Sequence, residues 1–439
     1  MSNEFNMMLA RRGLLRGSAL LGAGAFAGLF PLTRAFAAEA ASIEAQWPTV
    51  TAMLDQYVEA KQVPGMIAAL GWGSAAPGYI ARGFEGFGDP DKNGPDSLFR
   101  AYSMTKPVTG MAAMMLIDEG KLGMDQKVAD FIPEFAQMKV AVDPLKSLDA
   151  IPAKTQITVR QLMTHTAGLG YAGVSRNKVG EELLRLGVVP ASLSRFPIPG
   201  ISSAVKTPGP DEFARLAATV PLVAEPGTRW SYSMGLDVLG IVIQRASGAA
   251  SFAQFLADRM FAPAGMTSSW FQVPDGEKHR LTTNYGIVGG SPIPIDAADN
   301  SIYLDAPAFA FGGAGLVTSP ADYDRFLSMV AGGGVVGGKR VMSEAAVRLG
   351  TSNLIADSVD RKGTFIDGAG FGAGGRVGIG ADVGTYGWAG AAGTIAFTNT
   401  RIGLRAGVYV QYMPSESLPI QKDFPLAVLK DVSALKQAA

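Results

Sequence analysis

One stretch of the chain is apolar on every face, and it constrains the fold more than any other feature. Residues 111–117 read Met-Ala-Ala-Met-Met-Leu-Ile, within a helix predicted from about Ser103 to Glu119 and ended by Gly120. A helix that is hydrophobic all round has no face suited to water, so it belongs in the interior of a domain. We therefore predict a buried central helix.

Strand-like segments occur towards both ends of the chain. Residues 66–72 and 79–84 are predicted strands with glycine and proline between them, and glycine-separated strands follow over residues 370–411. Residues 125–310 are predicted to be mostly helices joined by loops rich in proline and glycine. We expect an α/β (α+β) fold in which both chain ends build one sheet and the helical section is a large insertion.

Composition excludes several functional classes. The chain of 439 residues has no cysteine, which rules out disulfides, thiolate metal sites and iron–sulfur clusters. Lysine plus arginine equals aspartate plus glutamate at 38 each, so no basic field attracts nucleic acid. With only His165 and His279 present, a multi-histidine metal site is impossible. No metal and no cofactor is expected.

The N-terminus has the pattern of an export signal. Arg11 and Arg12 precede an apolar stretch rich in glycine and alanine, and a small-residue cleavage site ends at Ala37. Paired arginines before a weakly apolar stretch indicate a twin-arginine signal peptide over residues 1–37. The stretch is shorter than the about 20 residues that a membrane span needs. We expect a periplasmic or secreted protein with no stable membrane anchor.

Ser103 and Lys106 begin the apolar helix and form a Ser-x-x-Lys motif. Residues three apart on a helix are neighbours, so the lysine can take the hydroxyl proton if its surroundings favour the neutral amine. The same spacing follows Ser175, Ser203 and Ser433, but in loop-like sequence or an exposed terminal helix. Only Ser103 begins an apolar helix directly after a strand, which predicts that it is a nucleophile for acyl transfer.

Residues 103–109, Ser-Met-Thr-Lys-Pro-Val-Thr, resemble the nucleophile segment of the serine β-lactamase and penicillin-binding-protein superfamily. The chain is most similar to the class C β-lactamase-like branch, and within it to the family VIII carboxylesterases. Five further segments resemble family blocks and occur in the family's order: residues 120–135, 162–169, 226–233, 312–316 and 386–390. The resemblance covers about residues 45–415.

The resemblance implies a fold and a set of roles. The fold would be β-lactamase/transpeptidase-like, with an antiparallel sheet flanked by helices; residues 38–120 and 312–439 would form the α/β domain and residues 121–311 the helical domain. Ser103 would be the nucleophile and Lys106 its proton partner. Tyr232 would be the second base and the acid that protonates the leaving group. The backbone N–H groups of Ser103 and Ala391 would form the oxyanion hole.

Two departures from the family motifs bear on the substrate. Met234 replaces the asparagine of Tyr-x-Asn, and Trp388-Ala389-Gly390 replaces Lys-Thr-Gly. In the family, that asparagine holds the substrate amide and the catalytic lysine, and the third-motif lysine meets the β-lactam carboxylate. A site without this cation favours a neutral acyl or alkyl group. We expect Met234, Trp388 and Gly390 to contact the substrate.

These observations predict a serine carboxylesterase that cleaves short-chain or small-alcohol esters through an acyl-Ser103 intermediate. The open alternatives are a β-lactamase, a D-amino-acid amidase or peptidase, an acyltransferase, and a non-catalytic binder of peptidoglycan or acylated ligands. The partner would be a small-molecule ester, not a nucleic acid. His165 is expected to have a local hydrogen-bonding or packing role, and His279 to be exposed. The loop at residues 186–210 is expected to shape the pocket.

Overall fold

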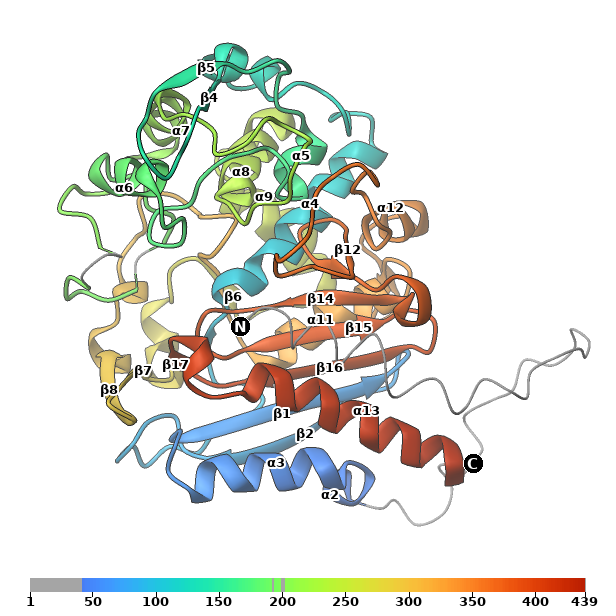
Figure 1. Ribbon diagram of the computed structural model, residues 1–439. Coiled ribbons are helices and arrows are strands. Elements are labelled where there is room, and N and C mark those ends of the chain that lie inside the picture. Colours follow the sequence, from blue (N-terminus) through green and yellow to red (C-terminus); the bar gives the residue numbers. More distant parts are fainter. Residues whose placement is uncertain (1–41, 192, 199–201, 439) are drawn as a thin grey trace, which may run out of the picture.

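The computed structural model describes residues 42–191, 193–198 and 202–438 (Figure 1). The predicted signal peptide, residues 1–37, lies outside the described residues. Within the described part of the chain, no helix combines the length and the apolar character needed to cross a membrane.

The centre of the fold is a seven-stranded antiparallel sheet built from both ends of the chain, as predicted. Its strand order is β12-β13-β14-β15-β16-β1-β2. The two chain ends meet where β1 pairs with β16, with Ile67 opposite Tyr409. The strands are β1 (Gly65–Trp72), β2 (Gly78–Gly83), β12 (Gly370–Phe371), β13 (Arg376–Val377), β14 (Thr385–Ala389), β15 (Ile395–Asn399) and β16 (Leu404–Tyr409).

Both faces of this sheet are covered by helices (Figure 1). Successive side chains of a strand point to opposite faces, and accordingly Met66 packs in one hydrophobic cluster while Ile67 packs in another. The helices α2 (Ile43–Gln46), α3 (Pro48–Glu59) and α13 (Ile420–Ala438) lie on the first side, and α4 (Thr105–Asp118), α11 (Pro320–Ala331) and α12 (Glu344–Gly350) on the second.

Helix α4 is the buried central helix that the sequence predicts. Every residue from Thr105 to Leu116 is buried. A short 3₁₀ turn, Tyr102–Met104, leads into it from strand β3 (Phe99–Arg100). The helix packs against α8 of the helical part and α12 of the sheet part, so its first turn lies between the two halves of the molecule.

The middle of the chain is mostly helical, and it forms the upper part of the view in Figure 1. Its helices are α5 (Val159–Met163), α6 (Lys178–Arg185), α7 (Pro210–Thr219), α8 (Gly235–Ser247), α9 (Phe252–Leu256) and α10 (Ala262–Ala264), and a π-helical turn, Ala257–Phe261, joins the last two. A two-stranded ribbon of β4 (Lys139–Ala141) and β5 (Ala150–Pro152) accompanies them.

Strands that the sequence did not separate from the helical section lie in residues 269–296. They are β6 (Ser269–Trp270), β7 (Asn284–Val288) and β8 (Ser291–Asp296). Two of them pair with strands from outside that section: β6 with β9 (Val317–Thr318), and β7 with β17 (Tyr412–Met413), while β8 pairs with β7. Pro292 and Pro294 obscure the strand pattern of β8, which tolerates them because it is an edge strand. A further ribbon joins β10 (Val335–Val336) to β11 (Lys339–Arg340).

Candidate active site

Ser103 lies in the 3₁₀ turn at the start of α4, one turn before Lys106. The Lys106 Nζ atom donates a hydrogen bond to Ser103 Oγ at 3.0 Å. Tyr102, directly before the serine, has a positive φ of 42°, a conformation that non-glycine residues rarely adopt and that often marks functional sites. The structure therefore brings Ser103 and Lys106 together as their spacing predicts.

Tyr232 completes a three-residue constellation. Its hydroxyl lies 2.6 Å from Ser103 Oγ and donates to it. The ring of Tyr232 is surrounded by other aromatic side chains, with ring centroids 6.1 Å from Trp230 and 6.0 Å from Trp388. This packing fixes the direction of the hydroxyl, so Ser103 Oγ accepts a hydrogen bond on two sides, from Lys106 Nζ and from the Tyr232 phenol.

Lys106 is fully buried, and its side-chain nitrogen makes a small number of contacts. Besides Ser103, the Nζ atom donates to the carbonyl oxygen of Gly313 at 2.6 Å. It also lies 4.7 Å from the ring centroid of Tyr232 and 5.4 Å from that of Tyr171. Cation–π contacts of this kind partly replace the lost hydration of a buried cation.

Such an arrangement is suited to covalent acyl transfer. A serine hydroxyl is a weak nucleophile until a neighbouring group takes its proton. Here the deprotonated form of either Lys106 or Tyr232 is within hydrogen-bond reach of that proton, and the same groups can return it to a leaving group. No group of three or more His, Cys, Asp or Glu side chains that could hold a metal ion occurs in the described part of the chain.

Trp388 and Gly390 lie beside this constellation, at the end of β14. The Trp388 Nε1 atom is 3.5 Å from the Tyr232 hydroxyl, so an indole edge stands where the family motif has a lysine. A Cβ atom on Gly390 would lie 2.5 Å from the Ala101 carbonyl oxygen, which shows how closely this backbone approaches the nucleophile turn. Ala391 packs against the hydrophobic cluster that contains Tyr102. The oxyanion role of the Ser103 and Ala391 N–H groups stays a prediction.

The sequence predicts that Met234 contacts the substrate, but the position of Met234 in the structure does not suit that role. Its side chain is only 1% exposed and belongs to the main hydrophobic core. It precedes α8, and its N–H donates to the Gly170 carbonyl oxygen. A side chain so enclosed offers little surface to a substrate, and the structure gives Met234 a packing role at the base of the site.

The two histidines have different roles. His165 is fully buried, and its Nδ1 atom accepts the N–H of Ser233 at 3.2 Å, directly after Tyr232 in the chain. Burial, and then the nearby Lys106 charge, lowers the pKa of His165 well below its ordinary value, so the imidazole is neutral. His279 is exposed. The expected local role of His165 is confirmed: it holds the segment that carries Tyr232.

Asp237 is a residue that the sequence analysis did not single out. It is fully buried in the first turn of α8, and its Oδ1 atom accepts the N–H of Gly313 at 2.7 Å. Burial raises its pKa to about 6, against the opposing influence of Lys106 and of the Gly313 N–H. The available signal was a lone acid in the apolar stretch Gly235-Leu-Asp-Val-Leu-Gly240.

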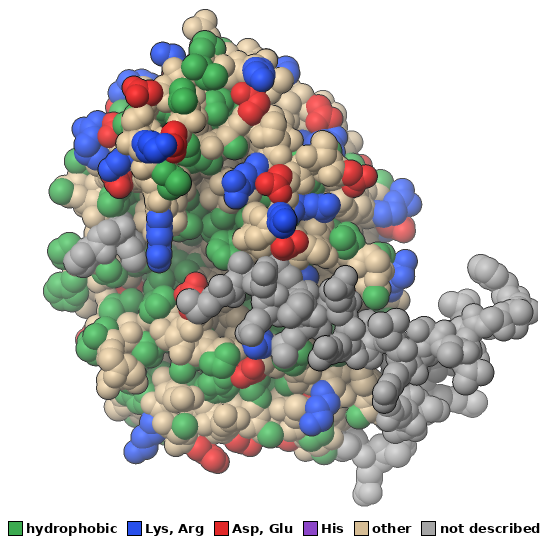
Figure 2. All heavy atoms as spheres, viewed as in Figure 1, with side chains coloured by type: hydrophobic (Ala, Val, Ile, Leu, Met, Phe, Trp, Pro, Cys, Tyr) green, Lys and Arg blue, Asp and Glu red, His purple; other side chains and the backbone are tan. Residues whose placement is uncertain are grey.

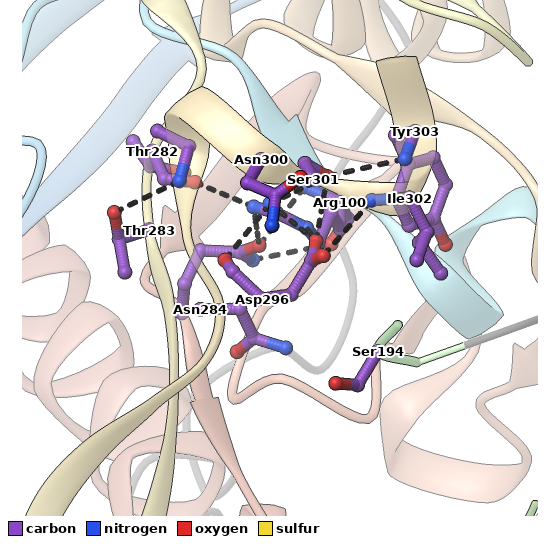
Figure 3. Close-up of polar contacts among 12 residues, drawn as sticks. Arg100, Ser194, Thr282, Thr283, Asn284, Asp296, Asn300, Ser301, Ile302 and Tyr303 are labelled. Atoms are coloured by element: carbon purple, nitrogen blue, oxygen red, sulfur yellow. Dashed lines mark hydrogen bonds and ion pairs between the residues drawn. The ribbon is translucent and has the colours of Figure 1, made fainter. Parts of the chain in front are cut away.

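A buried ion pair anchors the strand in front of Ser103 (Figure 3). Arg100 and Asp296 are both fully buried, with Nη2 and Oδ2 2.6 Å apart. Arg100 also donates to the Thr282 carbonyl oxygen and to Ser301 Oγ. Removing one partner of such a pair leaves an uncompensated buried charge, at a cost of about 3–5 kcal/mol. The pair thereby fixes β3, and with it the nucleophile turn, against the β7–β8 hairpin.

A cavity of about 480 Å³ lies near the nucleophile turn, and its lining residues do not include Ser103, Lys106 or Tyr232. On the face shown in Figure 2, hydrophobic side chains gather in a hollow between the helical part and the part that carries the sheet. The cavity's apolar lining includes Phe196, Phe271, Ile302, Tyr303, Phe309 and Phe311. Tyr303 contacts the ring of Tyr102 beside the nucleophile, and Phe311 lies two residues before Gly313. Part of the loop at residues 186–210 contributes to the wall of this cavity.

Comparison with known proteins decides the family. The model of the Beta-lactamase family matches residues 50–429, most of the chain. This chain belongs to the Beta-lactamase family. The family match extends across both parts of the fold and includes Ser103, Lys106 and Tyr232.

Two relatives and one solved structure are similar to this Beta-lactamase family member. Protein Rv1367c of Mycobacterium tuberculosis is 34% identical over 329 residues, which cover 70% of this chain and 77% of that protein. Esterase EstB of Burkholderia gladioli is 30% identical over 316 residues, covering 67% and 72%. The structure of EstCE1, described as a hydrolase with promiscuous acyltransferase activity, has a TM-score of 0.69 at 23% identity, covering 87% and 98%.

Proposed function

We propose that this protein is a serine carboxylesterase, similar to the family VIII enzymes, that cleaves neutral carboxylic esters through an acyl-Ser103 intermediate. The observation that carries the proposal is the position of Ser103 Oγ, 3.0 Å from Lys106 Nζ and 2.6 Å from the Tyr232 hydroxyl. A nucleophile held by two proton carriers has no evident use in a protein that only binds its ligand. The 30% identity with an esterase supports the same reaction class.

In the proposed reaction, Ser103 Oγ attacks the ester carbonyl carbon while its proton passes to the Lys106–Tyr232 pair. The N–H groups of Ser103 and Ala391 stabilise the oxyanion that forms. When the carbon–oxygen bond to the alcohol breaks, Tyr232 returns the proton to the departing alkoxide, leaving the acyl group on Ser103. Water then attacks the acyl carbon, gives its proton to the same pair, and the acid leaves as the serine recovers its proton.

Trp388 is the main argument for an ester rather than a β-lactam. It occupies the place where the family motif has the lysine that meets the β-lactam carboxylate, and it presents an indole edge towards Tyr232 instead. Loss of a charged partner weakens discrimination in favour of an anionic substrate, because the carboxylate would be desolvated without compensation.

We propose that the cavity near the nucleophile turn receives one side of the ester. About 480 Å³ with several aromatic side chains accommodates a larger apolar group than a short acyl chain. We propose that one side of the ester is bulky and apolar, which extends the short-chain expectation. Narrowing the cavity with Ile302→Trp should lower kcat/KM for a naphthyl ester about tenfold, with p-nitrophenyl butyrate little affected. Ile293→Trp, on the exposed strand β8, is the matched control.

The first test compares hydrolysis of p-nitrophenyl butyrate and of a chromogenic cephalosporin by the purified protein. We expect ester turnover with little cephalosporin turnover, and loss of about a thousandfold or more in Ser103→Ala. Ser433→Ala is the control, because Ser433 has the same Ser-x-x-Lys spacing but is exposed on α13. Efficient cephalosporin turnover would contradict the substrate assignment, and activity that survives in Ser103→Ala would contradict the mechanism.

Acyl transfer to an alcohol is the second candidate function. The structural neighbour EstCE1 is described as having promiscuous acyltransferase activity, and the acyl-Ser103 intermediate can be resolved by an alcohol in place of water. Adding a primary alcohol to the ester assay distinguishes hydrolysis from acyl transfer. Formation of the new ester in excess over free acid supports a transferase.

We also propose export through the twin-arginine pathway with cleavage near Ala37, on the sequence pattern of residues 1–37 alone. Replacing Arg11 and Arg12 by lysine should retain the full-length chain inside the cell. N-terminal sequencing of the exported protein should begin near Ala38, and a start within the folded part would contradict the cleavage site.

A further inference from the structure

Two hydrogen bonds to one residue connect a buried carboxylate with the lysine of the site. The Gly313 N–H donates to Asp237 Oδ1 at 2.7 Å, and the Gly313 carbonyl oxygen accepts from Lys106 Nζ at 2.6 Å. Asp237 and Lys106 are both fully buried. A Cβ atom on Gly313 would lie 2.4 Å from Asp237 Oδ2, so this position admits only glycine while the carboxylate stays in place.

The charges around Asp237 are few. Lys106 on α4 is the cation that acts on it, and Tyr171 faces it from the loop before α6. Burial, and then the Asp237 charge, raises the pKa of Tyr171 well above its ordinary value, which keeps that phenol neutral. The other titratable groups near Lys106 are Tyr232 and the neutral His165. Asp237 is thus the carboxylate that faces the Lys106 charge.

The second carboxylate oxygen has no partner. Asp237 Oδ2 is buried and makes no hydrogen bond within the described residues. An unpartnered buried carboxylate oxygen costs free energy that a purely structural side chain would avoid. Its negative charge does, however, act on Lys106 through a medium of low dielectric, where Coulomb interactions are stronger than in water.

We propose that Asp237 is a positioning residue for the reaction: it holds Gly313 so that the Gly313 carbonyl fixes Lys106 beside Ser103, and its negative charge stabilises the cation that Lys106 becomes when it takes the Ser103 proton. This inference rests on the proposed role of Ser103 as nucleophile. Asp237 itself touches no reacting atom. Its carboxylate form is required, so activity should fall as Asp237 becomes protonated.

The test is Asp237→Asn, because an amide oxygen can still accept the Gly313 N–H while the charge is removed. The readouts are the rate of Ser103 labelling by a fluorophosphonate and the hydrolysis of p-nitrophenyl butyrate from pH 5 to 9. We expect both rates to fall about tenfold or more at pH 8, because the variant keeps the Gly313 hydrogen bond but loses the charge that stabilises protonated Lys106, and a tenfold effect corresponds to about one pKa unit. The decline of the wild-type rate near pH 6 should be absent from the variant, with KM little changed.

Asp324→Asn is the matched control. Asp324 is also buried, and its carboxylate binds Arg405, which donates to the carbonyl oxygens of Gly73 and Ala75 between β1 and β2. This variant should lose stability and keep the wild-type pH profile. If Asp237→Asn does not fold, Gly313→Ala provides the second variant, since its Cβ displaces the carboxylate while both backbone groups remain; it should slow labelling similarly.

A pH profile of Asp237→Asn that superimposes on the wild type, at equal rates, overturns the inference while leaving the esterase proposal intact. Conversely, if the wild type labels on Ser103 in an Asp237-dependent way but hydrolyses no ester, the positioning role stands and the proposed substrate class is wrong. The two failures are therefore distinguishable.

Discussion

The hydroxyl of Tyr232 lies 2.6 Å from Ser103 Oγ, although the two residues are 129 positions apart in the chain. Ser103 lies in the 3₁₀ turn that leads into the central helix α4, and Tyr232 precedes α8 in the helical part. Helices α4 and α8 pack directly against each other, so the distance between the two hydroxyls is set by the packing of two buried helices. The site depends on this contact more than on any local segment.

Tyr232→Phe tests that relationship, because it removes the hydroxyl and keeps the ring among its aromatic neighbours. We expect kcat/KM for p-nitrophenyl butyrate to fall by about 10²–10⁴-fold, the usual contribution of a general acid–base group. The melting temperature should change little. Tyr57→Phe, which removes a hydroxyl bound to Asp423 on the far face of the sheet, should leave activity unchanged. Equal activity in the two variants would contradict the role of Tyr232.

Trp388→Lys tests whether the third motif decides the substrate. The variant restores the cation that the family motif provides at this position. The ratio of kcat/KM for a chromogenic cephalosporin to that for the butyrate ester should rise about tenfold or more, because a charged partner for the carboxylate is regained. Trp388→Phe keeps an aromatic ring without the charge and should not raise the ratio. An unchanged ratio in Trp388→Lys would show that discrimination lies elsewhere.

Gly390→Ala tests the close approach of β14 to the nucleophile turn. The new Cβ atom would lie 2.2 Å from Thr394 Oγ1 and 2.5 Å from the Ala101 carbonyl oxygen. The loop must move, and the predicted oxyanion donor at Ala391 moves with it. Loss of one such donor typically costs about 10²–10³-fold in kcat. Gly276→Ala, where a Cβ meets open space, is the control; a similar small effect in both would argue against the oxyanion assignment.

His165 predicts a pH dependence of stability. Its pKa is lowered in the folded state, so below about pH 6.5 the unfolded chain binds a proton that the folded chain does not, and stability falls as the pH falls. His165→Asn should flatten the decline of the melting temperature between pH 7 and 5, and asparagine also suits the positive φ of 57°. His279→Asn, at an exposed position, should leave the decline of the melting temperature unchanged.

Glu85 and Asp237 change the stability of the fold with pH in the direction opposite to His165, over the same pH range. The reason is that burial raises the pKa of each carboxyl group to about 6. A carboxyl group with a raised pKa stabilises the fold at low pH and loses that contribution as the pH rises. The informative quantity is therefore the difference in melting temperature between His165→Asn and the wild type at each pH. A difference that does not change with pH would show that His165 titrates normally.

Much of the framework was predictable from local patterns. The all-apolar stretch in α4 required burial, and the structure buries every residue from Thr105 to Leu116. Strand patterns at both chain ends predicted a sheet from both termini, which the pairing of β1 with β16 confirms. The strands β7 and β8 were missed because prolines and glycines interrupt their alternation.

By itself, the sequence determined the residues that face inward and the order of the motifs, because side-chain periodicity and turn chemistry are local properties. Ser103 and Lys106 follow from their spacing together with their place at the start of an apolar helix. Only the tertiary structure decided that Met234 is enclosed in the core and that Asp237 faces Lys106 through Gly313. Gly313 lies 207 positions after Lys106. No local pattern encodes such a distance, since it results from how the helices and the sheet pack around a shared core.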